Sequence, residues 1–119
     1  MATKPLGDRG EGLAAEHLVR AGWVIADRNF RLGHSEIDLV ARRGEVVAFV
    51  EVKTRSGLGY GHPLETITLR KRREIQRVAG AWVARHGRPG DLYRFDAIAI
   101  LAGSGGVAEL EHVENAWRM

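Results

Sequence analysis

The chain has 119 residues, 45% of them hydrophobic, which allows one ordinary domain with a single core. It has no cysteine, which excludes disulfides and thiolate metal sites, so any metal would be held by carboxylates or histidines. The net charge of +3 weakly favours a polyanionic partner. There is no signal-peptide pattern, and no apolar run approaches the roughly 20 residues that cross a bilayer. We therefore expect one cytoplasmic domain over residues 1–119 with no membrane association.

The first half of the chain predicts one helix followed by three strands. The helix is expected over residues 8–21, ending at Gly22, because glycine readily adopts the left-handed conformation that stops a helix. Alternating apolar residues predict strands over residues 23–30, 36–41 and 46–54. The third strand is apolar on both faces, which is typical of the centre of a sheet.

The second half predicts a helix and a β-hairpin. Apolar residues at helical spacing extend from Leu64 to His86, and Lys71 lies within this stripe. Strands are expected over residues 94–101 and 107–113, joined across a glycine-rich turn. The sum is an α/β fold with a mixed sheet flanked by helices.

The candidate site lies on the second and third strands. Strand alternation places Glu36 and Asp38 on one face, and Glu51 and Lys53 on one face of the next strand. If these strands pair, three carboxylates and an ammonium converge, and burying them is costly unless they bind a cation or one another. Oxygen ligands suit hard cations, so the pattern predicts a site for Mg²⁺ or Mn²⁺.

An acidic-x-Lys triplet is expected about 0.4 times by chance in a chain of this composition, so the triplet alone means little. Its place at the end of a central strand, after a hairpin partner with its own carboxylates, makes coincidence much less probable. In addition, 15 of the 18 Lys and Arg residues are arginine, yet the site position is Lys53. Lysine is a compact charge that can approach a water, whereas arginine is a planar fork.

The full pattern resembles the UPF0102 (YraN-like) family, within the PD-(D/E)xK, restriction-endonuclease-like superfamily, and is similar to archaeal Holliday junction resolvases. The resemblance is carried by GDRGEGLAAEHL, GWVIADRNFR, SEIDLVA, VAFVEVKTRSG, RFDAIAI and HVENAW. It implies an αβββαβ(β) core and a metal-dependent endonuclease acting on DNA, including branched or structured DNA. By position it makes Asp38 and Glu51 metal ligands, Lys53 the catalytic lysine and Glu11 an accessory carboxylate. Helical spacing independently places Glu11 on the inward face, in line with Leu18.

For several residues the sequence allows two roles. Glu36 either contacts the metal or forms a salt bridge with a nearby arginine. Tyr60 and His62 either stack on a base or have no ligand role. Basic residues around the second helix either contact phosphates or form a solvated surface. The predicted phosphate-binding residues are Arg55, Arg70, Arg72, Arg73 and Arg77.

The sequence therefore supports two main functional hypotheses. The first is a Mg²⁺- or Mn²⁺-dependent nuclease, and the second is a non-catalytic nucleic-acid-binding module with a nuclease-like fold. A protein-interaction domain whose carboxylates only hold the fold together has less support. DNA is favoured over RNA as the partner, and the choice between a monomer and a homodimer stays open.

Overall fold

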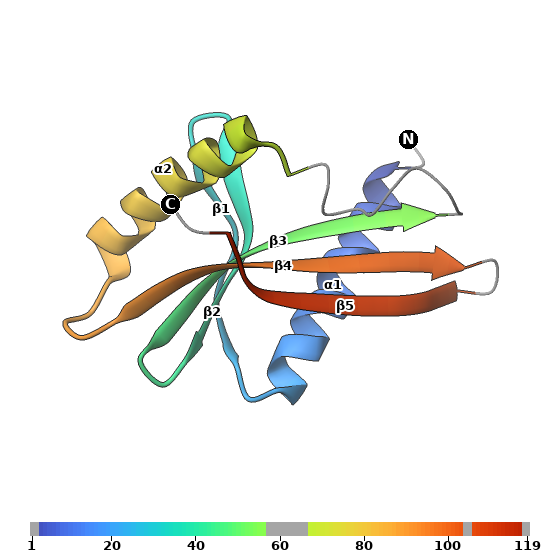
Figure 1. The fold of residues 1–119 in the computed structure, drawn as a ribbon, viewed down its shortest axis with the longest axis horizontal. Helices are drawn as coiled ribbons and strands as arrows, with labels where there is room; N and C mark the ends of the chain where they lie inside the picture. Colours follow the sequence, from blue (N-terminus) through green and yellow to red (C-terminus); the bar gives the residue numbers. More distant parts are fainter. Residues whose placement is uncertain (1–2, 57–66, 104–105, 118–119) are drawn as a thin grey trace.

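The computed structural model describes residues 3–56, 67–103 and 106–117 (Figure 1). Its elements are α1 (Thr3–Arg20), β1 (Val24–Leu32), β2 (Ser35–Arg43), β3 (Val46–Ser56), α2 (Leu69–His86), β4 (Leu92–Gly103) and β5 (Gly106–Trp117). This αβββαββ order confirms the predicted α/β fold. In the part of the chain that the structure describes, no helix is long and apolar enough to cross a membrane.

The strands form one mixed sheet in the order β1-β2-β3-β4-β5. β3 and β4 are parallel, and the other neighbours are antiparallel. A parallel pair needs a long crossover connection, and α2 lies in the segment that joins these two strands. β3 occupies the centre of the sheet, which confirms the prediction from its two apolar faces.

Some element boundaries differ from those predicted. α1 begins at Thr3 rather than near residue 8, because Pro5 lies in the first turn, where a missing N–H costs the helix nothing. α2 begins at Leu69 rather than near Leu64, since Thr68 is extended and caps the helix. All five strands extend beyond their predicted C-terminal ends, because the backbone continues to pair where the apolar pattern has ended.

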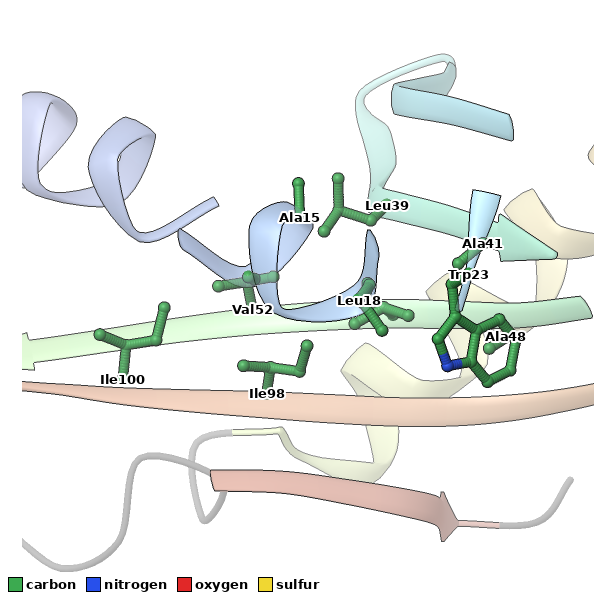
Figure 2. Packing of buried hydrophobic residues seen from close by; sticks show 11 residues of the cluster. Ala15, Leu18, Trp23, Leu39, Ala41, Ala48, Val52, Ile98 and Ile100 are labelled. Carbon is green, nitrogen blue, oxygen red and sulfur yellow. The ribbon is translucent and has the colours of Figure 1, made fainter. Parts of the chain in front are cut away.

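Each face of the sheet has its own hydrophobic cluster. Ala14, Ala15 and Leu18 of α1 belong to one of them. Figure 2 shows Ala15 and Leu18 of this helix facing Val52 and Ile98 of the sheet. A side chain at Gly10 would collide with Thr54, so only glycine allows α1 to lie this close to β3.

The opposite face is covered by α2. The buried residues of this helix are Ile75, Val78, Ala79 and Trp82. They pack with Phe49 of β3 and other buried residues of the sheet. Side chains along β3 therefore alternate between the α1 and the α2 clusters.

The sheet forks between β2 and β3. These two strands pair from the Arg43–Val46 end of their hairpin to Leu39–Val50. Beyond that point β2 continues along β1, while β3 continues along β4, and Figure 1 shows the two pairs of strands pointing in different directions. We call this point of divergence the fork.

Candidate functional site

Asp38 and Glu51 occupy the fork. They are the next positions beyond the last β2–β3 pair, Leu39–Val50. The side chain of Asp38 replaces the missing ladder contact, because its Oδ2 accepts a 2.7 Å hydrogen bond from the backbone N–H of Val52. Asp38 is 8% exposed and Glu51 is 4% exposed. The fold thus brings together the two carboxylates that strand alternation and the hairpin predicted to be neighbours.

The two carboxyl groups are not fully neutralised by their surroundings. Burial raises the pKa of Glu51 to about 9, and the hydrogen bond and negative charge of Asp38 act in the same direction. The positive charges of Lys71 and Lys53 oppose this shift. Glu51 Oε2 is buried and has no hydrogen-bond partner. At neutral pH Glu51 therefore keeps its proton, and its buried Oε2 is free to accept a donor or to bind a cation that displaces the proton.

This donor set fits a hard divalent cation. Mg²⁺ is commonly bound through one or two carboxylates and keeps several waters, so Asp38 and Glu51 are a sufficient protein contribution. The expected convergence of three carboxylates is not formed: within residues 3–56, 67–103 and 106–117, no three acidic or histidine side chains are grouped to hold a metal. The two carboxylates at the fork are therefore the candidate ligands.

Glu36 and Glu11 have other neighbours. Glu36 Oε2 lies 3.0 Å from Arg31 Nε, on the residue directly opposite in β1, which is one of the two interpretations of this side chain. Because β2 no longer pairs with β3 at this point, Glu36 lies beside β1 and not beside Glu51. Glu11 is half-buried and reaches from α1 to β1, where its Oε1 accepts a 2.9 Å hydrogen bond from Asn29 Nδ2. The metal and accessory roles of these two residues stay predictions.

Two lysines act on Glu51. Lys53 is half-buried and lies two residues further along the same strand, on the same face. Lys71, in the first turn of α2, was not predicted as a site residue. Its signal was present in the sequence, because Lys71 belongs to the inward stripe with Ile75 and Val78. An apolar stripe that includes one lysine indicates a charge directed at the sheet.

The arginines of α2 fall into two groups. Arg70 and Arg73 are exposed, and so is Arg77, whose Nη2 lies 3.4 Å from Ser35 Oγ. Arg72 was expected on the same outward side, but it is half-buried and its guanidinium lies 5.6 Å from the centre of the Trp117 ring. Helical geometry explains the difference, since position 72 lies at the border of the buried stripe. Arg55 of β3 is half-buried.

A second buried polar cluster lies on the α1 face of the sheet and was not predicted. Asp96 of β4 is fully buried. Its carboxylate accepts hydrogen bonds from His112 Nε2 at 2.8 Å and from the backbone N–H of Asn115 at 3.0 Å, and it pairs with Arg94. His112 Nδ1 lies 3.2 Å from His17 Nε2 of α1. Burial alone would raise the pKa of Asp96, but hydrogen bonds from His112, Asn115 and Arg94 keep it below its ordinary value.

Tyr60 and His62 lie outside the described residues.

The sequence of this chain matches one protein family over most of its length. The sequence pattern of "Uncharacterised protein family UPF0102" matches residues 10–100. A UPF0102 protein of Rhodococcus jostii is 47% identical over 94% of this chain and 95% of its own length. One from Geobacter sulfurreducens is 47% identical over 98% of this chain and 91% of its own. The chain therefore belongs to the family UPF0102, as its sequence motifs indicated.

Proposed function

We propose that this protein is a metal-dependent endonuclease that hydrolyses phosphodiester bonds of DNA. One observation carries the proposal: two adjacent buried carboxylates, Asp38 and Glu51, include a buried oxygen without a partner. Keeping two such groups side by side away from water is costly for a fold. A cation that neutralises both would remove this cost, and the lysines beside them suit a reaction on a phosphate.

The proposed chemistry is direct hydrolysis. When bound, Mg²⁺ or Mn²⁺ lowers the pKa of a coordinated water and neutralises charge on the phosphate. Lys53 orients a water whose oxygen forms a bond to phosphorus, while the bond from phosphorus to the leaving sugar oxygen breaks. The proton of the attacking water passes to solvent, and the leaving oxygen takes a proton from a second water. Asp38 and Glu51 would hold the metal, and neither forms a covalent intermediate.

A non-catalytic nucleic-acid-binding module is the second candidate. It is favoured by the small number of grouped carboxylates in the described parts of the chain, and by the exposed arginines of α2. Both candidates use the same basic surface, because exposed arginines attract the phosphate backbone regardless of sequence. They differ in whether Asp38, Glu51 and Lys53 have a chemical role.

Labelled linear, flapped and four-way-junction DNA, incubated with Mg²⁺ or Mn²⁺, separates the two candidates. We expect the wild type to cut at least one substrate, and Glu51→Gln to lose both cleavage and Mn²⁺ binding in calorimetry. Lys53→Ala should lose cleavage but keep most of its DNA affinity, because one contact is a small part of a multi-contact surface. Glu45→Gln, which changes an exposed carboxylate in the β2–β3 turn, is the matched control.

Two outcomes would contradict the nuclease proposal. Unchanged Mn²⁺ affinity in both Asp38→Asn and Glu51→Gln would exclude the fork as a metal site. A wild type that binds DNA but cuts none of the substrates with either metal would favour the binding module.

The basic surface has its own test. DNA affinity of the wild type should fall steeply with salt, and Arg73→Ala should reduce the slope of log K against log salt by about 0.9, as expected for one lost phosphate contact. Affinity that stays flat between low and physiological salt would contradict a phosphate-dominated interface. The same titration with RNA of matched sequence compares the two nucleic acids.

A further inference from the structure

The cap and the first turn of α2 determine where Lys71 lies. Thr68 caps α2, and its Oγ1 accepts a 3.2 Å hydrogen bond from the backbone N–H of Lys71. Lys71 precedes the buried residues Ile75 and Val78 by four and seven positions, which places all three on the same face of the helix. The first turn of α2 therefore directs a half-buried lysine toward the sheet.

Lys71 and Lys53 approach Glu51 from different elements. Lys53 comes from β3, the strand that carries Glu51, and Lys71 comes from the helix that covers this face. The charges of both lysines favour the ionised form of Glu51.

The residue type at position 71 is itself informative. The residues immediately around it in α2 are Arg70, Arg72 and Arg73, so lysine occurs only at the inward position of this basic run. A lysine ammonium is a compact charge that fits beside a small anion, whereas a guanidinium needs the space of a planar fork. The first turn of a helix also favours anions, because its free N–H groups carry partial positive charge.

We propose that Lys71 is a second substrate-contacting lysine, which binds a non-bridging oxygen of the phosphate that is cut. This inference rests on the proposed nuclease function and adds a residue to its site. The ammonium of Lys71 is free to pair with an anion, and a phosphate held by a cation at Asp38 and Glu51 would supply one. A positive group placed in advance stabilises the charge that develops on the phosphate oxygens during hydrolysis.

The small number of lysines makes a direct test practical. The chain contains three, Lys4, Lys53 and Lys71, so ¹³C labelling at lysine Cε gives few signals, which single Lys→Arg variants assign. The probe is a short DNA duplex with phosphorothioate linkages, added with Mg²⁺. We expect the Lys53 and Lys71 signals to shift and the Lys4 signal to stay. A shift of Lys53 without Lys71 would overturn this inference alone, whereas no shift of either lysine would overturn the proposed site as well.

Kinetics provide the second test. Lys71→Met keeps the aliphatic part of the side chain, and the control Arg20→Met removes an exposed positive charge at the end of α1. We expect Lys71→Met to lower kcat at saturating DNA about 100-fold, the usual effect of losing one charge-stabilising group. Its Mn²⁺ affinity should not fall, and Lys71→Arg should recover part of the rate. Arg20→Met should keep the wild-type kcat.

A wild-type kcat in Lys71→Met would overturn the inference. So would a loss of Mn²⁺ affinity as large as that of Glu51→Gln, because Lys71 would then act through the metal ligands and not on the phosphate. A thermal unfolding curve for Lys71→Met establishes that the variant is folded in both experiments.

Discussion

The buried carboxylates on the α1 face of the sheet and those at the fork differ in how many hydrogen-bond donors surround them. On the α1 face, Asp96 accepts from His112 and Asn115 and pairs with Arg94, and these donors hold its pKa below the ordinary value. At the fork, Asp38 and Glu51 face each other, and the pKa of Glu51 rises to about 9. Both clusters are buried, so burial does not account for the difference. The difference in pKa comes from the number of hydrogen-bond donors around each carboxylate.

This contrast distinguishes a structural carboxylate from a candidate functional one. A buried carboxylate with a full set of donors stabilises the fold in its ionised form and needs no ligand. A buried pair with a partnerless oxygen destabilises the fold when ionised and gains free energy by binding a cation. The largest difference between the clusters should therefore appear when each carboxylate is neutralised.

The largest expected effect is that of Asp96→Asn. The substitution places an amide among three donors and removes the charge that pairs with Arg94, so we expect a loss of about 3–5 kcal/mol in the free energy of unfolding. Urea denaturation at neutral pH measures it. Glu51→Gln is the matched substitution at the fork and should not destabilise the fold. Equal destabilisation by the two variants would contradict the distinction between the clusters.

Glu51→Gln should raise the stability of the fold, by an amount that depends on pH. The folded state keeps the proton of Glu51 up to a pKa of about 9, whereas the unfolded chain loses it near the ordinary value of 4.5. The wild type therefore loses stability as pH rises between these two values, because the folded state binds more protons there. Glu51→Gln removes this loss, so its thermal midpoint should exceed that of the wild type increasingly toward pH 9. A constant difference across this range, measured without metal, would contradict the assignment.

The smallest expected effect concerns His17. Burial lowers its pKa below 6.5, and the charge of His112 acts in the same direction. In the neutral pair, His112 donates to Asp96 and can accept from His17, so protonating both rings disrupts their contact.

Above pH 6.5 His17 is neutral in both states, and its contribution is lost as pH falls toward the lowered, folded-state pKa. Replacing His17 with Gln should reduce this acid-induced loss of stability, because Gln does not titrate. Urea unfolding above and below this pH measures the difference, with exposed His34→Gln as the control. An unchanged pH dependence in the His17 variant would show that this contact carries no protonation linkage.

The sequence alone was enough to predict the element order, the central position of β3, the buried stripe of α2 and the proximity of Asp38 to Glu51. These features depend on local periodicity and on one short hairpin, so residue spacing is enough to predict them. The same spacing placed Lys71 in the buried stripe of α2. Its proximity to Glu51 could be recognised only once it was known which strand α2 covers.

Which polar side chains meet across the fold could not be predicted from the sequence. Alternation predicted that Glu36 would follow Asp38 toward Glu51, but the fork leaves Glu36 beside Arg31. The contact between His17 and His112 joins residues 95 positions apart. Such contacts depend on where paired strands diverge and on how a helix packs across several strands. Residue spacing within one segment contains no information about either.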